Sequence, residues 1–125
     1  MSELAIQGIY EVAVRVRDLS KSEAFYCDVM GLTVGLRDGS RRWLFLRAGQ
    51  TSGMLVLQED KSSWPVQHVA FTIKERDLDA ACERLAEEGI EFEGPVLHEW
   101  MPAKSVYFSD PDGNDLELCA PLVNS

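Results

Sequence analysis

The sequence has few cysteines and no long apolar run. Its three cysteines, Cys27, Cys82 and Cys119, are too few and too widely spaced for a disulfide framework or a paired-cysteine metal site. We therefore expect reduced, buried thiols and a cytoplasmic location. No stretch approaches the roughly 18 apolar residues of a membrane span. The first residues also lack the basic and apolar regions of a secretory signal.

Basic residues are scarce as well. Lys and Arg number 12 against 21 Asp and Glu, which gives a formal net charge of −9. Charge of this sign repels phosphate backbones and anionic lipid, so we expect neither a nucleic acid nor a membrane partner. The same charge suits a metal or a cationic ligand, or it only keeps the protein soluble. The length of 125 residues predicts one domain with a real core.

The chain repeats itself in two halves. Residues 10–16, with the sequence YEVAVRV, resemble residues 67–73, with the sequence QHVAFTI, and both alternate like half-buried strands. A helix and three short strands are predicted after each of them. The strand candidates are residues 33–37, 42–47, 54–58, 91–92, 105–109 and 115–120. The expected fold is α+β: two tandem βαβββ modules, at about residues 5–60 and 65–121 of a single domain spanning 1–125, that form a cupped, partly open mixed sheet around a cavity.

Both predicted helices have clear ends. Ser20 and Glu23 have the spacing of a capping box, in which each side chain satisfies a free backbone donor of the first turn. Gly31 stands where a left-handed residue would end that helix. The second helix is predicted over residues 77–89, because apolar residues recur there at helical spacing before a glycine. Residues 110–114, DPDGN, predict a tight turn before the last strand.

One face of each predicted sheet is too polar or too small for a core. Alternate residues of a strand share a face. If the valines of the first strand pack against the first helix, Glu11 and Arg15 face away from it. By the same reasoning His68, Thr72 and Glu117 face away from the second helix. Such faces are typical of a cavity lining, and the matching repeat positions of Glu11 and His68 place both in one cup if the sheets face each other.

Glu11, His68 and Glu117 are together a candidate metal site. One imidazole and two carboxylates suit a divalent ion such as Fe(II), Mn(II), Zn(II), Ni(II) or Co(II). Three protein ligands leave positions open for substrate or water, as a catalytic site requires. Each residue also has an ordinary interpretation, as a hydrogen-bonded histidine or a solvent-facing carboxylate. With their matching positions, the pattern alone leaves the metal site and these ordinary interpretations evenly balanced.

Aromatic and basic residues are candidates for the rest of the cup. Trp43 and Phe45 share a strand face and would form a wall suited to a ring-bearing ligand, although core or surface positions are the alternative. Trp100 and Trp64 are expected in loops near the rim. Arg15 would either engage an anionic substrate or pair with a neighbouring carboxylate.

Three stretches of the chain resemble the vicinal oxygen chelate superfamily, which includes glyoxalases, fosfomycin and bleomycin resistance proteins, methylmalonyl-CoA epimerases and extradiol dioxygenases. They lie at residues 16–32, which contain VRDLS, FY and GL, at residues 68–71, HVAF, and at residues 107–118, YFSDPDGNDLEL. The similarity extends over residues 8–121. It implies the fold expected above, a small-molecule substrate and a homodimer.

The resemblance also implies metal ligands on the first strand of each module and on the last strand of one or both. Matched by position, these are Glu11, His68 and Glu117; histidine is common where this chain has Glu11, so the metal identity stays open. The first-module equivalent of Glu117 would be Leu57, here taken as part of the substrate pocket. Glyoxalase I enzymes place a ligand glutamate there. Since leucine neither binds a metal nor moves a proton, glyoxalase I activity is not expected.

The second half further resembles extradiol ring-cleaving dioxygenases, through His98, Tyr107, the DPDGN turn and Glu117. By analogy His98 would act as an acid or base near oxygen, and Tyr107 would bond a substrate hydroxyl; an exposed histidine and an ordinary strand tyrosine are the alternatives. This favours a metal-dependent dioxygenase. A metal-dependent isomerase or lyase, in which Glu11 or Glu117 moves a proton, and a metal-free protein that sequesters an antibiotic remain as alternatives.

Overall fold

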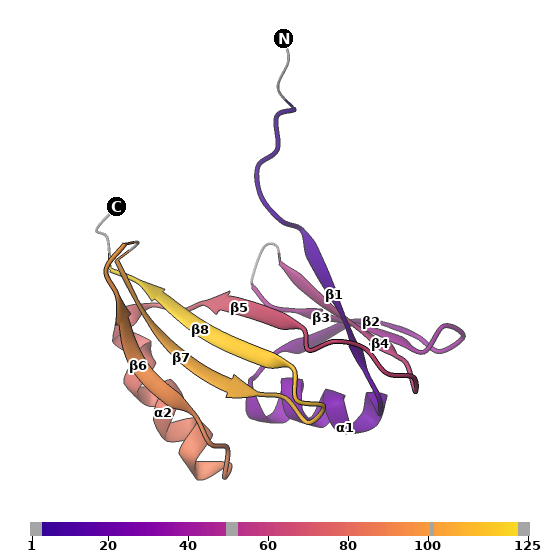
Figure 1. The fold of residues 1–125 in the computed structure, drawn as a ribbon. Coiled ribbons are helices and arrows are strands. Elements are labelled where there is room, and N and C mark those ends of the chain that lie inside the picture. The colour runs from indigo at the N-terminus through magenta and orange to yellow at the C-terminus, as the bar shows by residue number, and fades with distance from the viewer. Residues whose placement is uncertain (1–3, 50–52, 101, 123–125) are drawn as a thin grey trace.

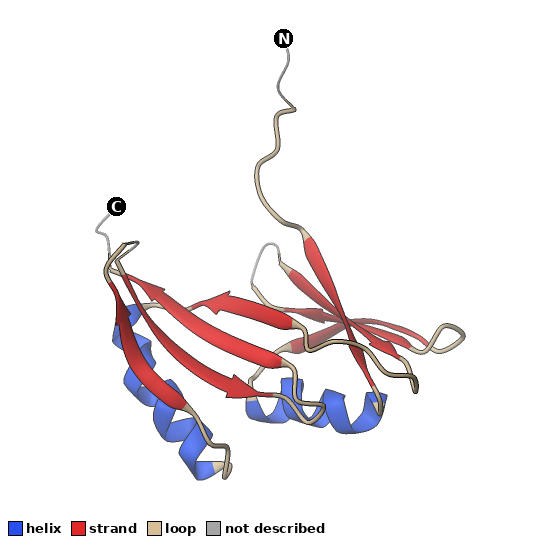
Figure 2. Cartoon of the chain, viewed as in Figure 1, coloured by secondary structure: helices blue, strands red, loops and turns tan. Residues whose placement is uncertain are grey.

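The computed structural model describes residues 4–49, 53–100 and 102–122, which form two four-stranded sheets with helices on one side of each (Figures 1 and 2). The strand orders are β1-β4-β3-β2 and β5-β8-β7-β6. The strands are β1 (Glu11–Val16), β2 (Thr33–Asp38), β3 (Trp43–Arg47), β4 (Met54–Glu59), β5 (His68–Thr72), β6 (Glu93–His98), β7 (Ala103–Ser109) and β8 (Asp115–Pro121). In both sheets the first and last strands of the module are parallel neighbours. The predicted tandem βαβββ architecture is confirmed.

Helices cover one face of each sheet and leave the other uncovered (Figure 1). In the first module α1 (Leu19–Glu23) continues directly into a π-helical segment, η1 (Ala24–Val29). In the second module a 3-10 turn, η2 (Glu75–Asp77), leads into α2 (Leu78–Glu87). Within the described part of the chain, no helix is long and apolar enough to cross a membrane.

The start of α1 differs from the prediction. Asp18, and not the Ser20–Glu23 capping box, caps the helix: its carboxylate accepts a hydrogen bond from the Lys21 N–H at 3.0 Å. Asp18 directly precedes the first helical residue, so its short side chain reaches the free donors of the first turn, whereas Ser20 already lies inside the helix. Glu23 instead pairs with Arg37 on β2. The predicted glycine end is present, with Gly31 at a φ of 84°.

The strand predicted at residues 91–92 is wrong, because the strand of this region is β6. β6 contains Gly94 and Pro95, a pair typical of turns, so the alternation in the sequence predicted a strand that stops at residue 92. The glycine is needed for close approach to β7. A Cβ on Gly94 would lie 2.5 Å from the carbonyl oxygen of Ser105, and its φ is 111°. It sits in an irregularity of the β6–β7 pairing between Glu93 and Val96.

The hydrophobic core lies between each sheet and its helices. Val14 and Val16 are buried beneath α1 as expected, but Val12 remains 38% exposed. The other buried core members are Tyr26, Leu44, Leu46, Leu55, Leu57, Leu78, Leu85, Val106, Phe108, Leu116 and Ala120. The three cysteines are free thiols but only partly buried, which corrects the expectation of full burial.

A buried polar network joins the two modules at the DPDGN turn. Tyr26 of the first module donates a hydrogen bond to Asp110 at 2.6 Å, and Asn114 donates to the same carboxylate at 2.9 Å. Gln67 donates to the Asn114 side chain at 3.0 Å and also bonds both backbone groups of Arg15. Burial and the neighbouring Asp110 charge raise the pKa of Tyr26, so its hydroxyl stays neutral. The turn therefore holds the modules together as well as linking β7 to β8.

Candidate metal centre

The uncovered face of the second sheet carries the candidate ligands. In the second sheet, Glu117 on β8 pairs directly with Ala70 on β5 and with Tyr107 on β7. His68 lies two residues before Ala70 on β5. Directly paired residues share a face, and so do alternate residues of one strand. His68, Glu117 and Tyr107 therefore project from the same side of the sheet, opposite α2, as the alternation in the sequence predicts.

His68 and Glu117 meet on this face. The Nε2 atom of His68 lies 3.4 Å from Oε1 of Glu117, with side-chain exposures of 53% and 15%. The second carboxylate oxygen, Oε2, accepts a hydrogen bond from the Ser105 hydroxyl at 2.7 Å. Ser105 itself is wholly buried. Because Ser105 engages Oε2, the oxygen that faces the imidazole is Oε1.

The separation of these two atoms suits a shared divalent ion. Ligands at about 2.0–2.1 Å from a tetrahedral zinc lie roughly 3.3–3.4 Å from one another, and the measured distance is 3.4 Å. An imidazole nitrogen and a carboxylate oxygen are also the donors that such ions prefer. The two residues therefore fit a metal, and they would supply two of its ligands.

Glu11 does not join them within one chain. Among the described residues, no three His, Cys, Asp or Glu side chains gather closely enough to hold a metal. Gln67, which directly precedes His68, is bonded to Arg15 near the far end of β1. Glu11 lies four residues earlier on β1, which is about 13 Å along an extended strand. The end of β1, and not its beginning, lies beside His68.

The first sheet presents its own uncovered face, on which Glu11 lies. Trp43 and Phe45 share that face, because Phe45 pairs with Val56 and Val56 pairs with Ala13. Their ring centroids are 6.3 Å apart. The guanidinium of Arg41 covers the Trp43 ring at 3.9 Å. The wall is thus aromatic with a cation at one end.

The assignment of Leu57 to the pocket is wrong. Ala70 pairs with Glu117, and Ala13, its equivalent in the first module, pairs with Val56. Val56 is therefore the equivalent of Glu117, and Leu57 faces the helix with no exposed surface. The predicted register was displaced by one residue, which moves a side chain to the opposite face. Valine, like leucine, offers no ligand at that position.

The remaining pocket candidates are dispersed. Arg15 forms an ion pair with Asp60 at 2.6 Å, the second of the two roles considered for it. Thr72 lies at the end of β5 beside Cys119, on the same face as Glu117. Trp100 is 84% exposed in the turn between β6 and β7. The structure does not bring Trp100 to the His68–Glu117 pair.

His98 and Tyr107 form a hydrogen-bonded pair next to Glu117. His98 is the last residue of β6, and its Nε2 atom lies 2.6 Å from the Tyr107 hydroxyl. Their rings are nearly perpendicular, at 84°. Tyr107 is the direct strand partner of Glu117. A group able to pass a proton thus stands beside the candidate ligands.

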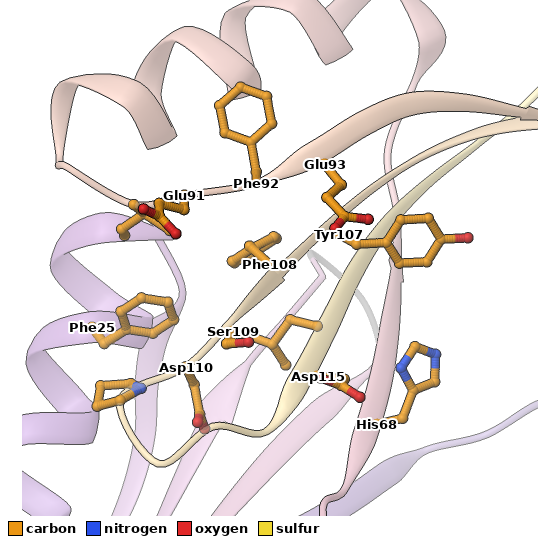
Figure 3. Close-up of a pocket in the computed structure, with 13 residues that line it drawn as sticks. Phe25, His68, Glu91, Phe92, Glu93, Tyr107, Phe108, Ser109, Asp110 and Asp115 are labelled. Atoms are coloured by element: carbon orange, nitrogen blue, oxygen red, sulfur yellow. The ribbon is translucent and has the colours of Figure 1, made fainter.

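A hollow of about 920 Å³ opens beside His68. Figure 3 shows His68 and Tyr107 on one side of it and Phe25 on the other. Glu93 and Asp115 also line it, and sequence reasoning did not single out either of them. The alternation of side chains along β7 and β8 could have predicted that Ser105 and Asp115 lie near the candidate ligands, because both share a face with Glu117.

Comparison with known protein families shows to which family this chain belongs. Residues 8–118 match the model of the Glyoxalase/Bleomycin resistance protein/Dioxygenase superfamily. The chain belongs to this superfamily. The match includes both modules and all three candidate ligands, so the resemblance noted in the sequence is confirmed.

Three relatives show the range of proteins that this superfamily member resembles. An integron cassette protein, HFX_CASS4, from the mobile metagenome of the Halifax Harbour sewage outfall is 43% identical, with a TM-score of 0.88 over 92% of this chain and 99% of that chain. The metallothiol transferase FosB of Staphylococcus saprophyticus is 30% identical over 90% of this chain and 76% of its own length. TnmS3, an antibiotic binding protein from Streptomyces sp. CB03234, is 30% identical, with a TM-score of 0.79 over 95% and 99%. Relatives of this chain thus include both an enzyme and a binding protein.

Proposed function

We propose that this superfamily member is a divalent-metal-dependent enzyme that acts on a small oxygenated molecule. His68 and Glu117 would hold the metal, and Glu11 of a second copy would complete the site in a homodimer. The observation that carries this proposal is the 3.4 Å separation of the His68 and Glu117 donor atoms on an uncovered sheet face. The similarity to a protein named a metallothiol transferase supports the metal.

The neighbouring residues suit proton transfer at a substrate oxygen. A divalent cation bound at this site supplies Lewis acidity to the oxygens of a substrate. Tyr107 accepts a proton from a substrate hydroxyl and passes its own hydroxyl proton to Nε2 of His98, so His98 ends as the imidazolium and Tyr107 is unchanged. Ser105 keeps Glu117 fixed while this happens. The pair thus acts as the base of the reaction.

Ring cleavage of a catechol-like compound, with dioxygen as co-substrate, is the sharpest form of this proposal. It rests on the likeness of His98, Tyr107 and Glu117 to the extradiol pattern, and on the aromatic wall of Trp43 and Phe45. Group transfer, isomerisation and lyase chemistry use the same metal and the same proton path. These reactions are therefore distinguished by testing substrates, because the arrangement of these residues is the same for each of them.

Metal analysis of protein purified without a chelator tests the proposal. We expect Fe, Mn, Co, Ni or Zn in stoichiometric amount, lost in Glu117→Ala and kept in Glu91→Ala. Glu91 is a suitable control because it is a carboxylate that lines the hollow beside His68 but lies outside β5 and β8, the strands that carry the two candidate ligands. Absence of bound metal, after supplementation with each ion in turn, would contradict the enzyme. Oxygen uptake with a panel of catechols then tests ring cleavage, and no uptake by iron-loaded protein rejects that reaction alone.

A metal-free antibiotic-binding protein is the second candidate. It is favoured by the similarity to TnmS3 and by the aromatic lining of the hollow, where Phe25, Phe92 and Tyr107 lie near Glu91 and Glu93. This arrangement suits an apolar ligand with a positive charge. Tight binding of such a drug by metal-free protein, unchanged in Glu117→Ala, would support the second candidate over the first.

A further inference from the structure

The charged residues on the uncovered face of the first sheet include one without a partner. Besides the candidate ligand, strand alternation places Arg15, Asp38 and Arg47 on this face. Arg15 is paired with Asp60 at 2.6 Å. Asp38 is paired with Arg41 at the same distance. Arg47 forms no ion pair with any residue that the structure describes, so its positive charge is left without a counter-charge there.

Arg47 stands in the same row of the sheet as Glu11. Met54 on β4 pairs directly with Glu11 on β1 and with Arg47 on β3, so all three side chains project from the uncovered face. The two charged residues are two strands apart, which separates their Cα atoms by roughly 10 Å. A Cβ on Gly35 would lie 3.3 Å from Cε of Met54 and 3.6 Å from Cγ of Arg47. The stem of Arg47 thus lies along the sheet beside Met54, and the exposed side chain leaves its guanidinium open to a ligand.

An apolar floor lies beside this row. It takes one residue from each strand, and these pair in the order Ala13, Val56, Phe45 and Leu36. A flat apolar molecule that rests on this floor has Glu11 near one end and Arg47 near the other, since each lies two residues from a member of the floor on its own strand. The first sheet therefore presents a carboxylate, an apolar surface and a cation within the length of one small molecule.

The charge of the proposed metal centre does not compensate Arg47. The two carboxylates of Glu11 and Glu117 cancel the charge of a divalent ion, and His68 would bind it as a neutral imidazole. Because Arg47 lies on the same sheet face as Glu11, it reaches the shared site together with that residue. A guanidinium in such a place favours a planar anion that it can bond through two nitrogens.

We infer that Arg47 binds a carboxylate of the substrate, so that the site selects small oxygenated molecules that are also acids. This inference rests on the proposed function, since Glu11 brings Arg47 to the metal. The metal would hold the neighbouring oxygens at one end of the substrate, and Arg47 would hold the acidic group at the other end. Arg47 is then a residue that determines specificity and is not a metal ligand.

A matched pair of probes tests the inference. Protocatechuate and its methyl ester share the catechol ring but differ in the charge of the carboxyl group. In zinc-loaded protein, where the metal is inert toward oxygen, titration calorimetry should show the acid binding at least about tenfold tighter than the ester. Arg47→Gln should abolish this preference. Arg47→Lys should keep part of it, because lysine retains the charge but not the two-pronged geometry.

Arg76→Gln is the matched control. It removes the same charge from an arginine that also has no ion pair within the described part of the chain, but that lies on η2 of the second module. Its preference for the acid should equal that of the unmodified protein. An Arg47→Gln protein with the same preference overturns the inference, and so does an unmodified protein that binds the ester as tightly as the acid.

Metal analysis separates this inference from the proposed function. Arg47→Gln should keep the metal, so bound metal without a preference for the acid would leave the proposed enzyme standing and overturn the role of Arg47. A protein that binds none of the ions would reject the enzyme. The same titrations on metal-free protein then decide the inference: a preference for the acid that Arg47→Gln loses supports it, and no preference overturns it.

Discussion

Among single residues, Ser105 orients the carboxylate of Glu117. It is a wholly buried serine on β7 that donates to Oε2 of Glu117 at 2.7 Å. A carboxylate held at one oxygen has fewer orientations to lose when its other oxygen binds a cation. Such supporting hydrogen bonds commonly contribute 10- to 100-fold to metal affinity.

Ser105→Ala should therefore weaken metal binding by about tenfold or more. Titration calorimetry with Mn(II) or Zn(II) measures this directly, without reliance on turnover. Ser109→Ala is the control, since Ser109 lies on the same strand face four residues further on and pairs with Asp115, whereas the Ser105 hydroxyl bonds Glu117. Equal affinities in the two variants would show that Ser105 does not orient the ligand.

Tyr26 gives a second prediction at this scale. Its buried hydroxyl donates to Asp110, so Tyr26→Phe leaves a carboxylate oxygen of the module junction without that donor. The expected cost is about 1.5–3 kcal/mol in the free energy of unfolding, measured by urea denaturation. Tyr10→Phe, where the side chain is exposed, should change stability little. A Tyr26→Phe protein as stable as the unmodified one would show that the bond contributes nothing net.

Among the elements, the end of β4 is tied to the start of α1 by a single carboxylate. Glu59 accepts from the Leu19 N–H at 2.9 Å and from Arg42 at 3.0 Å. The hydrogen bonds from Arg42 and the Leu19 backbone lower the pKa of Glu59 from 4.5 to about 2. The ionised form is therefore the one that holds strand and helix together.

The lowered pKa of Glu59 makes the stability of the folded protein depend on pH. Between about pH 5 and pH 2 the unfolded chain binds more protons at Glu59 than the folded protein does, so the stabilisation is present above pH 5 and is lost as the pH falls through that window. The stability difference between the unmodified protein and Glu59→Gln should shrink over the same range, in urea midpoints taken at intervals of pH. A difference that is constant with pH would contradict the linkage.

The irregularity in β6 gives another prediction for an element. Gly94→Ala would place a methyl group 2.5 Å from the Ser105 carbonyl oxygen, at a φ that favours glycine. We expect a loss of about 1–3 kcal/mol or more in the free energy of unfolding, seen in urea denaturation. Gly39→Ala serves as the control, because nothing lies within 4 Å of a Cβ there. Similar stability of the two variants would mean that β6 shifts to make room at no cost.

At the scale of the whole molecule, one chain leaves the proposed metal site incomplete. The two uncovered faces carry different candidate ligands, Glu11 on the first sheet and His68 with Glu117 on the second, and these do not converge among the described residues. In the proposed homodimer, the first sheet of one copy would face the second sheet of the other. The proposed homodimer thus follows from where the ligands lie.

Mixing two inactive variants tests this arrangement. Glu11→Ala and Glu117→Ala, each expected to lose the metal, should together recover about a quarter of the bound metal after subunit exchange. The fraction follows because half of the randomly formed dimers are mixed and each mixed dimer holds one intact site of two. Metal analysis after gel filtration measures it. No recovery, in a mixture shown to exchange subunits, would place all three ligands in one chain.

The sequence by itself determined the modules, the helices and the face on which most candidate residues lie. These depend on local patterns: period-two alternation in the strands, apolar recurrence in α2, and glycines at the ends of the helices. His68 and Glu117 could be paired from sequence because they lie on the same face of adjacent strands. The cap at Asp18 and the strand at β6 were missed, since neighbouring residues offered an equally good local signal.

Only the tertiary structure decided register and distance. A shift of one residue exchanged Leu57 for Val56 as the equivalent of Glu117, because alternation fixes faces but not which residues pair. The separation of Glu11 from His68 likewise depends on how the two modules meet, through the contacts of Gln67 with Arg15 and Asn114. Those contacts join residues far apart in the chain, and no local pattern contains them.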